Sequence, residues 1–97
     1  MGKYVLAYKG GGMPETDEEQ KQVMDAWMAW FGGLGDAVVD IGNPFGPSAA
    51  VGGGSTSGLT GYSIVNASNM DDALGKAGGC PILDGGGSVE VYETIAM

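Results

Sequence analysis

The sequence predicts one α+β domain in which strands and helices alternate in the order β-α-β-β-α-β. Three observations predict it: short apolar runs bounded by glycine, one long amphipathic segment, and one short one. Ninety-seven residues suffice for a single domain over residues 1–97. This order is the split βαβ, or ferredoxin-like, arrangement: a four-stranded antiparallel sheet with two helices on one face.

The first strand is expected over Lys3–Tyr8, a run rich in aromatic and aliphatic residues that three glycines follow. Alternation along it puts apolar side chains on both faces: Val5 and Ala7 on one, Tyr4, Leu6 and Tyr8 on the other. A sheet that is apolar on both faces needs two covers, and two helices supply only one. We therefore expect a two-fold homodimer in which the sheets of two copies pack face to face.

The long helix is expected to begin at Thr16, because Thr16-Asp17-Glu18-Glu19 has the form of a capping box. Three acids in the first turn also suit the positive end of the helix dipole. One helical stripe then collects the apolar residues: Val23, Ala26, Trp27, Trp30, Phe31 and Leu34. Glycines at positions 32, 33 and 35 end the helix.

The middle of the chain predicts two strands and a long connection. Ala37–Ile41 forms the second strand, and prolines 44 and 47 then interrupt pairing because proline cannot donate to a ladder. The chain is expected to resume as an edge strand around Ser48–Val51. Residues 52–58 form a flexible turn region, and Leu59–Ala67 forms the third strand.

The last part of the chain predicts a weak helix and a strand. Ser68-Asn69-Met70-Asp71 has the form of a helix start, and Asp72 and Lys76 are spaced as an i,i+4 ion pair. Glycines 75, 78 and 79 lower the helix propensity of this segment. The fourth strand is expected over Ser88–Ile95.

The charge balance excludes several classes of partner. Four lysines against twelve acids give a net charge of −8, and the chain has no arginine or histidine. Nucleic acids and anionic membranes are bound through clustered cations, and these lysines are isolated. The chain has one cysteine, no run of apolar residues long enough to span a bilayer and no recognisable signal peptide. We expect a cytoplasmic protein without a nucleic-acid or membrane partner.

An ordered set of short segments, spread over nearly the whole chain, resembles one known family. The segments are Tyr4-Val5-Leu6, Met13-Pro14, Trp27, Leu34, Gly42-x-Pro44, Gly61-Tyr62, Asp72-Ala73-Leu74, Cys80-Pro81 and residues 85–91. Together they resemble the YCII-related family of the dimeric α/β-barrel superfamily, in the branch without an Asp-Gly-Pro-Phe motif. The resemblance implies a ferredoxin-like subunit that pairs with a second copy to form a dimeric α/β barrel.

The resemblance also implies which chemistry is missing. In some members a histidine on the first helix and an aspartate before the proline after the second helix form a suspected catalytic pair. Trp27 and Cys80 stand near those two positions in this chain. The pair therefore cannot be carried over.

Other reactive sites are also disfavoured. Without histidine, and with Cys80 alone, the chain offers no imidazole or thiolate metal site. The Asp17-Glu18-Glu19 cluster is better explained as a solvated helix start, so we expect no metal and no cofactor. Cys80 follows a helix C-terminus, where the dipole disfavours a thiolate, and we expect it to be a small buried residue.

Two sets of residues remain as candidates for a site. Core and interface packing is the simpler explanation for Trp27, and the sharper hypothesis is that Tyr8, Trp27 and Tyr62 wall an apolar cleft between the long helix and the sheet. Asp40 and Glu90 lie within apolar strands, so each carboxylate either faces solvent or is desolvated enough to act as a general base.

Three functions follow from these residues. The first is a homodimeric binding or accessory protein that holds a small apolar molecule. The second is an enzyme that acts on a small apolar substrate by carboxylate acid–base chemistry. The third is a structural dimer without a ligand.

Overall fold

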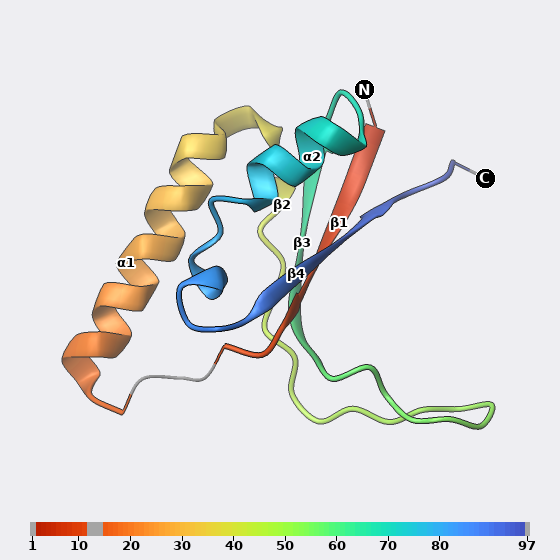
Figure 1. Ribbon diagram of the computed structural model, residues 1–97, viewed down its shortest axis with the longest axis horizontal. Helices are drawn as coiled ribbons and strands as arrows, with labels where there is room; N and C mark the ends of the chain where they lie inside the picture. The colour runs from red at the N-terminus through yellow and green to blue at the C-terminus, as the bar shows by residue number, and fades with distance from the viewer. Residues whose placement is uncertain (1, 12–14, 97) are drawn as a thin grey trace.

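The computed structural model describes residues 2–11 and 15–96. Its elements follow the order β1 (Gly2–Lys9), α1 (Asp17–Leu34), η1 (Gly35–Ala37), β2 (Val38–Asp40), β3 (Leu59–Ala67), α2 (Met70–Ala77), η2 (Pro81–Leu83) and β4 (Ser88–Glu93), where η denotes a short 3-10 helix (Figure 1). The four strands form one sheet in the order β2-β3-β1-β4, and each neighbouring pair is antiparallel. The predicted ferredoxin-like α+β fold is therefore confirmed.

The register of the sheet fixes which residues share a face. Leu6 of β1 stands opposite Ser63 of β3 and opposite Val91 of β4. Val5, one residue earlier, stands opposite Ile64 and Tyr92. Direct partners point to the same side of the sheet, so these two rows belong to opposite faces.

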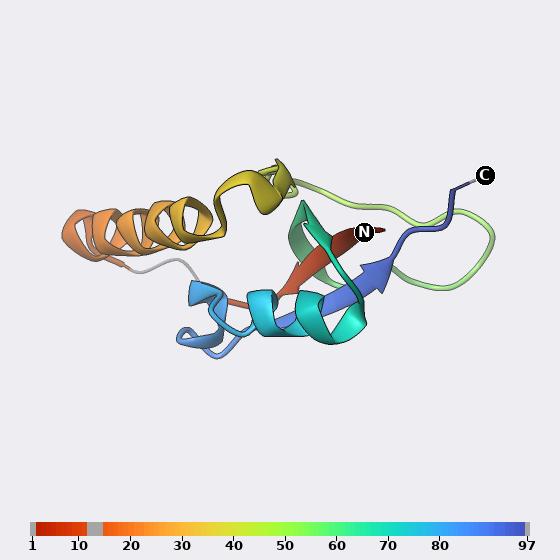
Figure 2. The same cartoon turned by 90° about the horizontal axis from the view of Figure 1, so that it is seen from above.

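Both helices pack on the face that carries Leu6. The core there contains Tyr4, Tyr8, Val65 and the two alanines of α2, and Leu6 and Val65 are 0% exposed. Figure 2 shows that α1 lies toward the β2 edge of this face and α2 toward the β4 edge. Alanines at positions 73 and 77 keep the α2 backbone close to the sheet, because a larger side chain would hold the helix away.

Helix α1 covers its share of the sheet less tightly. Its capping interaction forms as predicted, with the Thr16 hydroxyl accepting the Glu19 amide at 3.1 Å. The helix contains no fully buried residue, and Trp27, Trp30 and Leu34 are partly buried against the core. Two methionines on the adjoining surface of the helix, Met24 and Met28, are 60% and 58% exposed. Aromatic side chains at one face of α1 therefore make most of its contact with the domain.

The other face of the sheet has no helix over it. Its central positions are apolar: Val5 opposite Ile64, and Ala7 opposite Tyr62. The ring of Phe45 stacks on Tyr62 with the centroids 5.7 Å apart, so the chain after β2 covers one corner of this face. Tyr92, which stands opposite Val5 on this face, is nevertheless 53% exposed. We call this surface the open face.

A tight turn leads the chain from β2 to this corner. Gly42 has φ +79°, and a Cβ atom there would collide with the carbonyl oxygen of Tyr62, so the position requires glycine. After the turn, Phe45 N–H donates to the Thr60 carbonyl at 2.9 Å, and Pro44 forms an isolated bridge with Gly61.

Three local predictions need correction. The edge strand expected around Ser48–Val51 does not form, because this loop has prolines on one side and positive-φ glycines at 52–54 on the other. The cap of α2 is Asn69, not Ser68: its side chain accepts the Asp72 amide at 2.8 Å. Strand β4 ends at Glu93, two residues before the expected end. Met13-Pro14, part of the family resemblance, lies outside the described residues.

Candidate functional site

Tyr8 and Trp27, two of the three expected cleft walls, are in direct contact. Their rings meet edge to face with the centroids 5.0 Å apart. The Tyr8 hydroxyl donates to Ser63 Oγ at 2.7 Å, and Ser63 donates to the Ile41 carbonyl at 2.6 Å. These contacts join α1, β1, β3 and the chain after β2 in a buried and satisfied network. The space between α1 and the sheet is occupied here by Trp27 itself.

Tyr62, the third expected wall, lies on the open face, because its strand partner is Ala7. Tyr8 belongs to the opposite face with Leu6. The structure therefore does not bring Tyr62 into one cleft with Tyr8 and Trp27. The alternation of side chains within each strand was predicted correctly. Alternation carries no information, however, about how two strands are aligned.

Cys80 lies in the core at 2% exposure, as expected. Burial raises the pKa of its thiol to about 11, so the residue is a neutral thiol near pH 7. Burial likewise raises the pKa of Tyr8 to about 12, despite the opposing hydrogen bond with Ser63. Neither group offers a nucleophile or a proton acceptor at neutral pH, so this part of the core is structural.

Asp40 and Glu90, the two candidate general bases, both have local partners. Asp40 Oδ1 accepts the Gly42 amide at 2.8 Å and supports the turn after β2. Glu90 Oε1 accepts the Tyr92 hydroxyl at 2.8 Å, and this bond raises the pKa of Tyr92. Their strand partners are Ile64 and Ala7, so both carboxylates belong to the open face.

A hollow lies elsewhere, at the end of β3. It has a volume of about 340 Å³, and residues from η1, β3 and α2 line it: Asp36, Ala37, Asn66, Ala67, Ser68, Asp72 and Lys76. A volume of this order is at the lower end of the range for small-molecule sites. We call it the η1–α2 hollow.

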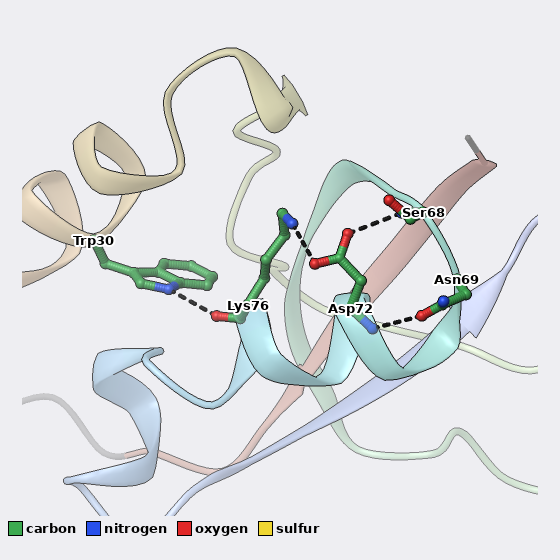
Figure 3. Close-up of polar contacts among 5 residues, drawn as sticks. All are labelled: Trp30, Ser68, Asn69, Asp72 and Lys76. Atoms are coloured by element: carbon green, nitrogen blue, oxygen red, sulfur yellow. Dashed lines mark hydrogen bonds and ion pairs between the residues drawn. The ribbon is translucent and has the colours of Figure 1, made fainter.

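One wall of the η1–α2 hollow is a hydrogen-bonded ion pair (Figure 3). Lys76 Nζ donates to Asp72 Oδ1 at 2.8 Å, and the Ser68 amide donates to Asp72 Oδ2 at 2.9 Å. The bond from Lys76, with that from Ser68, lowers the pKa of Asp72, which stays ionised. The Trp30 indole N–H donates to the Lys76 carbonyl at 3.1 Å, so α1 is bonded directly to this wall.

A second hollow, of about 160 Å³, lies against β4 and is apolar. Its lining residues are Leu74, Ala77, Gly78, Leu83, Val89 and Val91. This volume is below the usual range for a ligand site. In the part of the chain that the structure describes, no three His, Cys, Asp or Glu side chains are grouped so as to hold a metal ion.

Sequence reasoning identified only part of the η1–α2 hollow. The spacing of Asp72 and Lys76 predicted their ion pair, which the structure confirms. Asp36 lies more than thirty positions earlier in the sequence, in a 3-10 turn that no pattern predicted. Its place beside α2 depends on how α1 and β2 are set against the sheet, so no local signal could have indicated it.

Comparison with known proteins gives one result, at the level of fold. No family model matches the chain, and no curated protein matches its sequence. Among solved structures, the chain is similar to 5-chloro-2-hydroxyhydroquinone dehydrochlorinase from Burkholderia phenoliruptrix AC1100 in complex with 2,5-dihydroxybenzoquinone. The TM-score is 0.59 at 18% identity, over 96% of this chain and 93% of that chain. This likeness shows that the two chains share a fold.

The helices were also compared with the requirements of a membrane span. Over residues 2–11 and 15–96, no helix is both long and apolar enough to cross a bilayer.

Proposed function

We propose that this chain is a homodimeric small-molecule-binding module, related to the YCII-related proteins but without their suspected catalytic pair. The observation that carries the proposal is the open face: an apolar sheet surface that, within residues 2–11 and 15–96, the chain covers only at the corner beside Phe45. The family relation is supported by the ordered sequence segments and by the fold. Near the two positions of the family's catalytic pair stand Trp27, packed on Tyr8, and the buried Cys80.

The charges of the open face favour a second copy as its cover. By register the face carries Lys3 and Lys9 together with Asp40 and Glu90, so it is formally neutral. The whole chain carries −8, so two copies that meet through any other large surface bring more negative charge together. A two-fold axis through the open face buries Val5 and Ile64 of both copies without net repulsion.

Light scattering on substituted chains tests the dimer. The wild-type protein should have twice the 9.8 kDa mass of one chain at micromolar concentration. Ile64→Glu should give a monomer with an unchanged far-ultraviolet circular dichroism spectrum, because the charge falls in the centre of the interface. Met24→Glu, a matched change at an exposed apolar site on α1, should leave the dimer intact. A monomeric wild-type protein, or a dimeric Ile64→Glu variant, would refute the interface.

The binding role is supported by the η1–α2 hollow and by the similar dehydrochlorinase, which was solved with a small quinone. Trp30 is bonded to the wall of the hollow, so its fluorescence should report a ligand there. A screen of small metabolites should shift that emission for some compounds and leave a Trp30→Phe variant silent. If no compound shifts it, the chain is the structural dimer without a ligand.

The other two expected arrangements receive less support. An apolar ligand between Tyr8 and Trp27 must displace the tryptophan from its ring contact, and Tyr62 faces away from that position. Catalysis by Asp40 or Glu90 requires an open site beside them, yet both lie on the face that we assign to the dimer. We therefore favour binding at the η1–α2 hollow over both.

A further inference from the structure

The η1–α2 hollow carries charges that select one class of ligand. Three of its lining residues are ionisable: Asp36, Asp72 and Lys76. Asp72 and Lys76 neutralise each other through their 2.8 Å ion pair. The Asp36 side chain is exposed and makes no hydrogen bond or ion pair with any residue in the described ranges 2–11 and 15–96. The hollow therefore has one uncompensated negative charge.

The rest of the protein reinforces this selection. The net charge of −8 draws cations toward the chain and repels anions. Among the residues that the structure describes, Lys76 is the only cation that lines the hollow, and Asp72 is already paired with it. An anionic ligand would have to break that pair or approach Asp36 without a counter-charge. A protonated amine, in contrast, adds the charge that the hollow lacks.

Lys76 indicates a second feature of the ligand, an oxygen acceptor. Its ammonium group has three N–H donors, and one of them is used by Asp72. Two donors remain for an oxygen acceptor on a bound molecule. Ala37 and Ala67 add apolar surface to the lining, which suits a short carbon chain between the amine and the oxygen.

We propose that the η1–α2 hollow binds a small molecule with a protonated amine and an oxygen acceptor a few atoms away, such as an amino alcohol. The amine pairs with Asp36, and the oxygen accepts from Lys76. This inference rests on the proposed binding function and names its ligand class. It assigns no reaction to the site.

Titration of four probes into the full-length, ¹⁵N-labelled protein tests the class of ligand. The probes are 3-amino-1-propanol, propylamine, 1,3-propanediol and propionate. Amide shifts should saturate with the amino alcohol at the residues of the hollow, and the Trp30 indole signal should move with them. Propylamine should bind several-fold more weakly, because it leaves the Lys76 donors unused. The diol and propionate should not saturate over the same concentration range.

Three substitutions separate the two contacts. Asp36→Asn should weaken binding of the amino alcohol about threefold, because it removes the exposed charge that pairs with the amine. Asp25→Asn, an equal change at an exposed site on α1, should leave binding unchanged. Lys76→Met should retain amine binding and abolish the preference of the amino alcohol over propylamine.

Two outcomes would overturn the inference. One is equal binding to wild-type protein and Asp36→Asn. The other is an amine response confined to the acidic first turn of α1, Asp17–Glu19, which would mean diffuse attraction to an acidic protein. Light scattering on the same samples tests the proposed dimer separately, so a failure of the ligand class is distinguished from a failure of the dimer.

Discussion

The two faces of the sheet are formed by the same strands but differ in how completely their side chains are buried. On the helix side, Leu6 and Val65 are completely buried by α1, α2 and the neighbouring strands. On the open face, Val5 and Ile64 are half-buried and Tyr92 is 53% exposed. One face is buried by the chain that forms it, whereas the other has apolar groups that stay partly exposed.

The polar groups of the two faces differ in the same way. On the helix side, the buried Tyr8 and Ser63 hydroxyls are both hydrogen-bonded, and the described residues contain no buried side-chain nitrogen or oxygen without a partner. The open face instead has ionisable groups of both signs: Lys3, Lys9, Asp40 and Glu90. A closed core excludes charge, whereas a sheet face that is in contact with water tolerates it.

Truncation of one apolar side chain on each face should give the largest difference. Leu6→Ala should lower the free energy of unfolding by about 3 kcal/mol, since it leaves a cavity in a fully buried position. Ile64→Ala should lower the free energy of unfolding by less in dilute protein. The loss should grow with protein concentration, because the proposed dimer is then more populated. Urea unfolding at two protein concentrations a hundredfold apart measures the loss for both variants.

One outcome would contradict this difference between the two faces. If Ile64→Ala costs as much as Leu6→Ala and the loss does not change with concentration, the open face is covered within the chain. Val51→Ala, at a fully exposed loop position, provides the baseline for a truncation that removes no packing.

The sequence predicted these two faces more reliably than it predicted the site. Period-two alternation placed Val5 apart from Leu6 and Ile64 apart from Val65, and the capping box placed the start of α1. It could not align β1 with β3, which is why Tyr62 was assigned to a cleft on the wrong side of the sheet from Tyr8. The η1–α2 hollow likewise depends on the packing of three separate segments, and no local pattern records it.

Alkaline pH should weaken the helix side selectively. Burial raises the pKa of Tyr8 from about 10 to about 12 and that of Cys80 from about 9 to about 11. Both groups stay protonated in the folded chain while the unfolded chain loses its protons, so unfolding becomes easier as pH rises. The loss should begin near pH 9 with Cys80, continue to about pH 12 with Tyr8, and amount to about 2 kcal/mol for each group.

A double variant isolates the contribution of Tyr8 and Cys80 from that of the rest of the chain. Tyr8→Phe combined with Cys80→Ala should show a flatter profile of unfolding free energy between pH 9 and pH 12 than the wild type. Parallel profiles would mean that water reaches both groups in the folded protein, and that the helix side is less closed than its burial indicates.

The smallest effect concerns how firmly α1 closes the helix side, because this helix has no fully buried residue. Trp30→Phe removes the indole bond to the Lys76 carbonyl and keeps an aromatic ring, so it should cost about 1 kcal/mol in urea unfolding. Trp27→Phe is the matched change, since the Trp27 indole N–H has no hydrogen bond within residues 2–11 and 15–96. The loss of stability in Trp27→Phe should come only from the smaller buried ring area.

A larger loss for Trp30→Phe would mean that one hydrogen bond to α2 fixes α1 over the sheet. Equal costs would mean that aromatic packing on Tyr8 is what holds the helix, and that the wall of the η1–α2 hollow is independent of α1.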